Sequence, residues 1–398
     1  MLLPVRTMGM NSTPSGERVH IAFFGLCNTG KSSLVNAFTS QELSIVSACK
    51  GTTTDPVQKS MELLPLGPVL IIDTPGLDDT GALGALRVER TLKILRKTDI
   101  AILVSEAGRP LHPVEEELIR LFEERKLPWL LVLNKGDLAE DSRAGAVVTS
   151  ALRRTGIEEL KERTGALLGK ERQKPLVSDL CGEGDIILLV IPIDKAAPKG
   201  RLILPQQMVI RDALDSGAIP VMARDTELEA ALGKVTPKLV ITDSQAFGKV
   251  SRIVPETIPL TSFSILMSRY KGDLRRQIDA VTAVETLKDG DRVLIAEGCT
   301  HHRQCDDIGS VKIPRWIKEH TGSEPEYTFS SGTGYPEDLS GFKLIIHCGG
   351  CMLNEKEMRH RIEKAAEAGV PIANYGTLIA YLNGILRRSV APLPGYSL

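Results

Sequence analysis

The sequence predicts an α/β protein that consists of three units in series, and three observations lead to this prediction. Its 398 residues suggest two or three domains of about 100–200 residues each. Short apolar runs alternate with longer amphipathic stretches, which is typical of parallel sheets covered by helices. Apolar residues make up 42% of the chain and charged residues 25%, an ordinary composition for a globular protein with a buried core.

The first unit is predicted to span residues 18–170, after a flexible tail at 1–17 that is rich in Ser, Thr, Gly, Met and Pro. Runs in which neighbouring residues are all apolar indicate strands that are buried on both faces, as in a parallel sheet. The expected strands lie at 19–25, 69–72, 100–104, 129–133 and 147–148, and the expected helices near 115–126 and 157–168. Together they form a complete doubly wound domain.

A polar stretch at 171–184 is predicted to be a linker, and the alternation restarts in a second unit at 185–263. This small α/β unit contains no recognisable chemical motif. Its run at 186–193 would be a liability on an exposed sheet edge, so we expect a structural role such as pairing with another copy. Strands are expected at 186–192, 219–223 and 238–242, and a helix near 206–216.

The third unit, 264–398, shows the same alternation, which predicts a Rossmann-like fold. Strands are expected at 292–296, 342–346 and 370–373, and helices near 311–320, 355–368 and 377–387.

Charge and hydropathy argue against two classes of partner. The formal net charge is −1 and aromatic residues are only 4% of the chain, so neither a basic footprint nor a base-stacking surface for nucleic acid is indicated. Residues 1–18 lack the apolar core of a secretory signal, and the longest strongly apolar run, Ile186–Ile193, is too short to cross a bilayer. We therefore expect a cytoplasmic protein that binds neither nucleic acid nor membrane.

A phosphate-binding loop follows the first predicted strand. Gly25-Leu-Cys-Asn-Thr-Gly30-Lys31-Ser32 fits the pattern G-x-x-x-x-G-K-[ST] and precedes a helix, which is the context that the motif requires. Its backbone N–H groups can surround phosphate oxygens at the helix N-terminus. Lys31 is expected to contact the β- and γ-phosphates, and Ser32 to ligate Mg²⁺.

Two further motifs close later strands and specify the nucleotide. In Asp73-Thr-Pro-Gly76, the carboxylate is expected to act on Mg²⁺ through its water and Gly76 to donate its N–H to the γ-phosphate. In Asn134-Lys135-Gly-Asp137, Asp137 can accept hydrogen bonds from N1 and N2 of guanine, which adenine cannot offer in that pattern. GTP is therefore predicted in place of ATP, and Ser150–Ala151 fits the last loop around the base.

Gly51-Thr52-Thr53-Thr54-Asp55 lies where a first switch loop is expected. It resembles the G-T-T-x-D switch of translation-factor-like GTPases related to the tRNA-modification enzymes. By that resemblance Thr53 is the second hydroxyl on Mg²⁺, with Thr52 and Thr54 as close rivals, and Asn28 matches the asparagine that coordinates K⁺. Leu77 stands where Ras-like proteins carry a water-orienting Gln, so hydrolysis is expected to be slow.

The predicted nucleotide site can be stated as one set. The residues expected to contact the nucleotide are Asn28, Thr29, Gly30, Lys31, Ser32, Ser33, Thr53, Asp73, Gly76, Asn134, Lys135, Asp137, Ser150 and Ala151. Of these, Lys31, Thr53 and Gly76 are the predicted catalytic residues.

Cysteine and histidine gather at two strand ends of the third unit. Cys299 and His301 follow the strand at 292–296, and His347-Cys348-Gly-Gly-Cys351 follows the strand at 342–346, with 45 residues between the two histidines. Because carboxyl ends of parallel strands share one edge, the two groups can meet there. Three thiolates suit a [4Fe–4S] cluster with one exchangeable position, whereas two thiolates and two imidazoles suit structural zinc.

The other cysteines and histidines nearby have weaker assignments. His302 is expected either to support the site without ligating or to lie at the surface, and Cys305 is an alternative ligand. His301 and His347 are candidates for the fourth ligand, as are a carboxylate and water. The remaining cysteines, Cys27, Cys49 and Cys181, receive no role. A set of buried cysteines and hydrogen-bonded histidines is the non-functional alternative.

The order of these motifs resembles the [FeFe]-hydrogenase maturation GTPase family, HydF. A GTPase domain, a middle domain and a C-terminal C-x-H…H-C-x-x-C site are similar to that family over nearly all of the chain past residue 17, as are the strings Asp306-Asp-Ile-Gly and Lys312-Ile-Pro-Arg-Trp316. The resemblance implies a [4Fe–4S] cluster on Cys299, Cys348 and Cys351. It also implies a homodimer formed by the middle domain.

The resemblance further implies a scaffold and carrier for the two-iron subcluster of the hydrogenase. Two radical-SAM maturases would supply the precursor and the apo-[FeFe]-hydrogenase would receive it. The alternative is a translation or tRNA-modification GTPase with a C-terminal structural zinc site, which the near-neutral charge and sparse aromatic residues disfavour. A redox enzyme with its own substrate at the cluster is a third, weaker possibility.

Overall fold

The computed structural model describes residues 15–40, 57–77, 91–168, 174–193, 202–298, 307–332 and 334–396. The chain divides into two compact units, Met1–Arg172 and Gln173–Leu398. We describe each unit by itself. The predicted Thr53, Cys299, His301, His302 and Cys305 lie outside the described residues.

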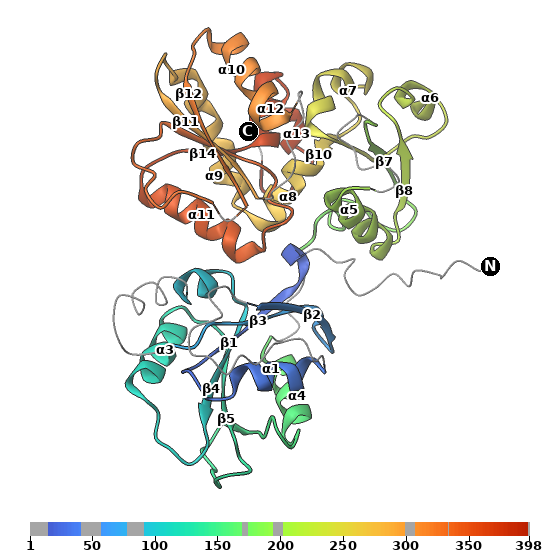
Figure 1. Ribbon diagram of the computed structural model, residues 1–398. Helices are drawn as coiled ribbons and strands as arrows, with labels where there is room; N and C mark the ends of the chain where they lie inside the picture. Colours follow the sequence, from blue (N-terminus) through green and yellow to red (C-terminus); the bar gives the residue numbers. More distant parts are fainter. Residues whose placement is uncertain are drawn as a thin grey trace, which may run out of the picture. The chain divides into compact units, whose positions relative to one another are not determined.

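The first unit is a doubly wound α/β domain around a six-stranded sheet of order β2-β3-β1-β4-β5-β6 (Figure 1). All neighbouring strands are parallel except β2, which pairs antiparallel with β3. The strands are β1 (Val19–Phe24), β2 (Val57–Leu63), β3 (Gly67–Asp73), β4 (Ile100–Glu106), β5 (Trp129–Asn134) and β6 (Val147–Val148).

Helices cover both faces of this sheet. Leu34 and Phe38 of α1 pack with Leu160 of α4 on one face, together with the inward side chains of β1 and β3. On the other face Phe122 of α3 packs against Phe24 of β1, with ring centroids 5.4 Å apart. The described helices here are α1 (Lys31–Thr39), α3 (Pro113–Glu124) and α4 (Ile157–Leu167), with a 3-10 turn at Ser15–Glu17 and further helix at 91–96.

The second unit contains two four-stranded sheets in which every described pairing is parallel. Their strand orders are β10-β9-β7-β8 and β12-β11-β13-β14. The first sheet is built from β7 (Ile186–Val190), β8 (Ile219–Ala223), β9 (Leu239–Thr242) and β10 (Leu260–Ser262), and the second from β11 (Arg292–Glu297), β12 (Glu326–Ser331), β13 (Leu344–His347) and β14 (Ile372–Asn374).

Most of the crossovers between these parallel strands contain helices, whereas no helix is described between β12 and β13. The α-helices are α5 (Leu204–Asp215), α6 (Leu228–Leu232), α7 (Phe247–Ile253), α8 (Phe263–Lys271), α9 (Leu274–Asp279), α10 (Ile313–Thr321), α11 (Glu355–Glu367), α12 (Tyr375–Leu382) and α13 (Leu386–Val390). Shorter pieces are 3-10 turns at Ser244–Ala246 and Ala280–Thr286 and a π-helical turn at Ile308–Lys312.

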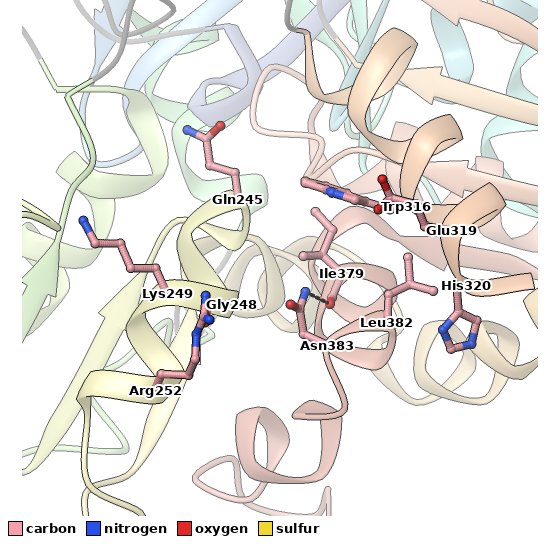
Figure 2. A pocket seen from close by; sticks show the side chains of 10 residues that line it. All are labelled: Gln245, Gly248, Lys249, Arg252, Trp316, Glu319, His320, Ile379, Leu382 and Asn383. Carbon is pink, nitrogen blue, oxygen red and sulfur yellow. Dashed lines mark hydrogen bonds between the residues drawn. The ribbon is translucent and has the colours of Figure 1, made fainter.

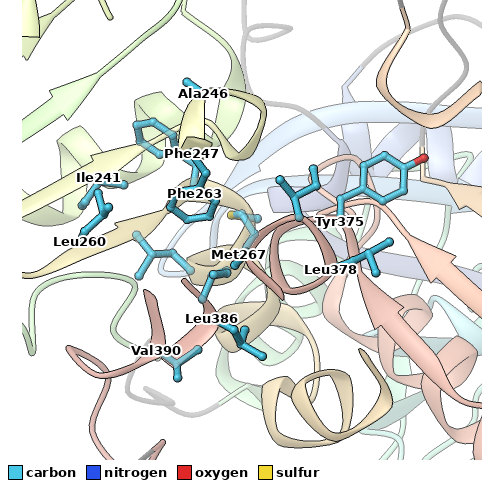
Figure 3. Packing of buried hydrophobic residues seen from close by; sticks show 14 of the residues in the cluster. Ile241, Ala246, Phe247, Leu260, Phe263, Met267, Tyr375, Leu378, Leu386 and Val390 are labelled. Atoms are coloured by element: carbon cyan, nitrogen blue, oxygen red, sulfur yellow. The ribbon is translucent and has the colours of Figure 1, made fainter. Parts of the chain in front are cut away.

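One hydrophobic core spans both sheets of the second unit. Figure 3 shows Phe263 and Met267 of α8 between residues of the first sheet, such as Leu260, and residues of α12, such as Leu378. Val390 of α13 joins the same cluster and is fully buried. The two sheets are therefore packed as one body, although each has the alternation of a separate α/β unit.

The structure adds two details to the middle of the chain. The long apolar strand β7 is an inner strand between β8 and β9 and is buried. One of the two edge strands is β8, where Ile219 and Met222 are 51% and 54% exposed. The predicted linker is also partly folded, because Leu176 and Val177 are buried in the unit's core and donate their backbone N–H groups to Asp212.

Across the described ranges, no helix combines the length and the hydrophobicity that a membrane crossing requires.

Candidate functional site

The phosphate-binding loop lies between β1 and α1. Gly30 caps the helix with a φ of 81°, a left-handed conformation that glycine adopts without steric cost. A Cβ at Gly25 would lie 2.3 Å from the carbonyl oxygen of Val104, so this position has no room for a side chain. The Thr29 hydroxyl donates to the Leu26 carbonyl at 3.0 Å and braces the loop from within. The loop therefore presents its backbone and the α1 N-terminus at the sheet edge.

A buried ion pair joins this loop to the end of β3. Lys31 Nζ lies 3.8 Å from Asp73 Oδ1, and both side chains are largely buried. Asp73 Oδ1 is buried and has no hydrogen-bond partner among the described residues, which is the state expected of a carboxylate that accepts from Mg²⁺-bound water. Ser32 follows Lys31 in the first turn of α1. These residues fit a Mg²⁺-nucleotide, whereas Ser33 is exposed on the same turn.

The motif that begins at Asp73 packs directly on the phosphate loop. A Cβ at Gly76 would lie 2.4 Å from Cys27 Sγ, and Leu77 donates its backbone N–H to the Gly25 carbonyl at 3.2 Å. The Leu77 side chain is buried in the core on the α3 face of the sheet. Gly76 therefore has no room for a side chain beside the loop at Cys27.

Asn134, at the end of β5, holds the two halves of the nucleotide site together. Its side-chain nitrogen donates to the Thr29 carbonyl at 2.9 Å, and its oxygen accepts from the backbone N–H of Ala151 at 3.1 Å. The hydroxyl of Thr149 approaches the same oxygen at 3.4 Å. Asn134 thus acts as a brace between the phosphate loop and the base loop, a role that the motif alone does not reveal.

The predicted guanine acceptor is held in place by its neighbours. Ser150 donates its hydroxyl to Asp137 Oδ1 at 2.6 Å, and Arg153 lies 3.9 Å from the other carboxylate oxygen. The hydrogen bond from Ser150 lowers the pKa of Asp137, so the carboxylate is ionised at neutral pH. Lys135 has a φ of 63° and pairs with Glu106 at 2.9 Å. Sequence reasoning missed Glu106, Thr149 and Arg153, which belong to no motif.

The second candidate site lies at the carboxyl ends of β11 and β13. The backbone N–H groups of Gly298 and Gly350 donate to Cys348 Sγ at 3.1 and 3.4 Å. Burial raises the pKa of the Cys348 thiol to about 11, while these two donors favour the thiolate. A Cβ at Gly298 would lie 3.3 Å from Gly350 Cα, so the two loops touch through their backbones. Gly298 is the last described residue before Cys299.

Two buried cations support the loop from Cys348 to Cys351. Lys271 of α8 is 2% exposed, and its Nζ donates to the carbonyls of Cys351 at 3.1 Å and Leu353 at 2.8 Å. Arg361 of α11 is 1% exposed and reaches the other end of the loop through His347. Buried cations and N–H groups that point at sulfur suit an anionic metal–thiolate group. Buried Glu297, near Cys348, is a negative charge that would disfavour a thiolate there.

His347 is brought to the site but is already engaged on both ring nitrogens. Its Nδ1 lies 2.8 Å from the Cys348 carbonyl, and its Nε2 lies 3.1 Å from Arg361 Nη1. Burial, with a contribution from the Arg361 charge, lowers the pKa of His347 to about 3, so the ring is neutral at neutral pH. Among the described residues no group of three or more His, Cys, Asp or Glu converges as a metal site.

A separate cleft of about 510 Å³ lies between α7, α10 and α12 (Figure 2). Lys249 comes from α7 and His320 from α10, and these are paired with Asp225 and Glu285, respectively. Gly248 and Asn383 both line it and are closely packed, since a Cβ at Gly248 would lie 2.7 Å from Asn383 Oδ1. Neither Cys348 nor Cys351 lines it, so this cleft is not the metal site that the sequence predicts.

Comparison with known families shows which family the chain belongs to. A model described as the hydrogen maturase F dimerization domain matches residues 176–272, and one described as the hydrogen maturase F tetramerization domain matches 275–392. The two together span more than half of the chain. The chain belongs to the HydF family. A model described as a 50S ribosome-binding GTPase matches residues 20–135 of the first unit.

Relatives of the first unit agree with a GTPase domain in this HydF protein. GTPase Der of Wolinella succinogenes is 38% identical over 125 residues, which cover 31% of this chain and 26% of that protein. tRNA modification GTPase MnmE of Bordetella petrii is 32% identical over 157 residues, which cover 38% of this chain and 34% of that protein. The HydF chain thus spans about a quarter to a third of the length of the curated relatives that it matches.

Solved structures of GTPases also match the chain. The G domain of the T. maritima FeoB iron transporter is 26% identical, with 38% of this chain and 98% of that chain covered and a TM-score of 0.29. A variant of Aquifex aeolicus Era bound to GDP.AlF4⁻ is 18% identical, with 59% and 97% covered and a TM-score of 0.35. The family models confirm three α/β units in series, support GTP, GDP and Mg²⁺ binding, and indicate oligomerisation through the second and third units.

The guanine assignment predicts a specific loss in Asp137→Asn. Replacing a carboxylate that accepts two hydrogen bonds removes about 1.5–3 kcal/mol per charged hydrogen bond, so GTP affinity should fall at least tenfold. Xanthosine triphosphate, which offers an oxygen at position 2, should then bind better than GTP. Glu140→Gln, at an exposed position in the same loop, is the control, and unchanged preference for GTP over ATP in Asp137→Asn would remove Asp137 from this role.

Proposed function

We propose that this HydF protein is a GTP-hydrolysing scaffold that carries a [4Fe–4S] cluster and assembles and delivers the two-iron subcluster of [FeFe]-hydrogenase. One observation carries the proposal: the loop from Cys348 to Cys351 has two N–H groups on the sulfur of half-buried Cys348 and a buried cation at each end, in a chain that also has a candidate nucleotide site. Cys299, Cys348 and Cys351 are the proposed cluster ligands.

The proposed roles in GTP hydrolysis come from the sequence motifs, and contacts in the first unit support some of them. Lys31 would bind the β- and γ-phosphates, since its amine already reaches Asp73 at the mouth of the loop. Ser32 and Thr53 would supply hydroxyls to Mg²⁺, and the N–H of Gly76 would contact the γ-phosphate. The Leu77 side chain is buried in the core and cannot orient water, so we infer slow hydrolysis that serves as a conformational signal.

At the proposed cluster site, the protein's residues would hold the cluster and compensate its negative charge. When bound, the cluster would offer one iron position open to an exchangeable ligand. Gly298 and Gly350 would direct their N–H groups to the Cys348 thiolate, and Lys271 and Arg361 would offset the negative charge that burial makes unfavourable. The proposed partners are two radical-SAM maturases, which supply the two-iron precursor, and the apo-[FeFe]-hydrogenase, which receives it. We place these encounters in the cytoplasm.

The cluster is tested by anaerobic reconstitution of the full chain with iron and sulfide. We expect about four irons per chain and the EPR signal of a reduced [4Fe–4S] cluster, as three thiolate ligands imply. Cys348→Ser should lose both, while Cys181→Ser, which changes a buried cysteine in the core, should keep both. Stoichiometric zinc without a paramagnetic cluster would favour the alternative, a translation or tRNA-modification type GTPase with a structural zinc site.

We also propose that K⁺ stimulates hydrolysis through Asn28, which is exposed in the phosphate loop with a φ of 66°. Asn28→Gly removes the amide oxygen and keeps this left-handed backbone, so the variant should bind GTP and lose most of its K⁺ stimulation. Hydrolysis rates measured in K⁺ and Na⁺ give the comparison. Equal rates in the two salts for the native protein would refute the proposal.

The homodimer is proposed to form at the unpaired edge of β8. Its exposed Ile219 and Met222 would be buried there, and a lysine on an edge strand opposes strand pairing. Met222→Lys should therefore lower the molar mass measured by sedimentation equilibrium. Leu152→Lys, at an exposed leucine of the first unit, should leave the mass unchanged. A native-like mass for Met222→Lys would place the interface elsewhere.

A further inference from the structure

Arg361 makes contacts that charge compensation alone does not explain. It is 1% exposed on α11 and is among the largest fully buried side chains of the described residues. Its Nε donates to Glu357 at 3.0 Å and its Nη2 to the Gly332 carbonyl at 2.6 Å. The guanidinium also stands over the ring of Tyr335, 4.8 Å from the centroid. Its position is therefore fixed on three sides before His347 is considered.

The hydrogen bonds of His347 can be assigned without any metal. The Cys348 carbonyl can only accept, so the Nδ1 that lies 2.8 Å from it must carry the proton. Arginine can only donate, so the Nε2 that lies 3.1 Å from Arg361 Nη1 must offer its lone pair. One arrangement satisfies both contacts, which is the neutral ring with its proton on Nδ1. Neither nitrogen then has a lone pair left for iron or zinc.

We propose that His347 is a positioning residue that holds Cys348 and is not a metal ligand, and that Arg361 locks it in this state. The inference deepens the proposed function and rests on it, since Cys348 is positioned for a cluster. It also removes His347 from the candidates for the fourth ligand. A zinc site with two cysteines and two histidines that includes His347 is disfavoured by the same argument.

The consequence for Cys348 is that three parts of the residue are fixed at once. Its N–H donates to the Ala296 carbonyl at 2.9 Å, which continues the pairing of β13 with β11. Its carbonyl accepts from His347, with Asn374 Nδ2 at 3.4 Å as a second donor. Its sulfur accepts from Gly298 and Gly350. Arg361 and His347 therefore act on the cluster through the direction of one thiolate.

The first test needs no cluster. Nitrogen NMR of the metal-free full chain with ¹⁵N-labelled histidine should show one ring, identified by its loss in His347→Asn, with a proton on Nδ1 and none on Nε2. Arg361→Met should remove this single state. Arg359→Met is the matched control, because Arg359 is on the same helix, exposed and paired with Glu355 at 2.9 Å. A native ring with its proton on Nε2 would overturn the proposal.

The second test uses the reconstituted, reduced protein. Pulsed EPR should show the same nitrogen couplings in native protein and in His347→Asn, because the asparagine amide can still donate to the Cys348 carbonyl. Arg361→Met should lower the affinity for iron about 10–100-fold, the usual effect of removing an outer partner of a metal site, whereas Arg359→Met should not. A strongly coupled nitrogen that disappears in His347→Asn would make His347 a ligand.

The two tests separate this inference from the function it rests on. If the native protein takes up zinc and no iron, the proposed function fails, and the tautomer of the metal-free protein still decides the role of His347. GTP binding by each variant reports whether the chain has folded. If Arg361→Met fails to fold, the tautomer and the nitrogen couplings of native protein and His347→Asn remain decisive.

Discussion

Both candidate sites depend on one constraint of parallel sheets. Each strand must be followed by a crossover, so all carboxyl ends meet at one edge and the loops that follow them become neighbours. In the first unit this brings together the loops after β1, β3 and β5, and Asn134 then ties the phosphate loop to the base loop. In the second unit it brings Gly298 at the end of β11 to Cys348 at the end of β13. The chemistry differs, but the sheet positions it in the same way.

The constraint explains why so much of the fold could be predicted from the sequence. Inner parallel strands such as β1, β7 and β13 are apolar on both faces and are recognisable as runs. The strands that sequence reasoning missed are at edges or very short. Antiparallel β2 and the parallel edge strand β12 carry polar residues, and β10 has only three residues, so none resembles a buried run. The π-helical turn at Ile308–Lys312, before α10, was also not predicted from the sequence.

In the two candidate sites, the residues that belong to sequence motifs could be predicted. The buried residues that hold them in place could not. Lys31, Asp73, Asn134 and Asp137 stand in fixed patterns, whereas Arg361 lies in a charged helix, where a cation usually faces water. Only tertiary packing shows that it is buried beside His347. The same holds for Lys271, which ends α8 and would pass for a basic residue that offsets the helix dipole. Apolar run length likewise does not reveal strand order, which places β7 inside its sheet and β8 at an edge.

The central proposal is that one chain carries a nucleotide site and a metal site that are built independently, in its two compact units. The most direct measurement is made on Lys31→Ala, reconstituted anaerobically beside the native protein, with nucleotide binding and iron content determined on the same samples. The account predicts that the variant loses nucleotide binding and keeps the native iron content and cluster spectrum. Iron content that falls in step with nucleotide binding would contradict it, because the metal site would then depend on the nucleotide site for its formation.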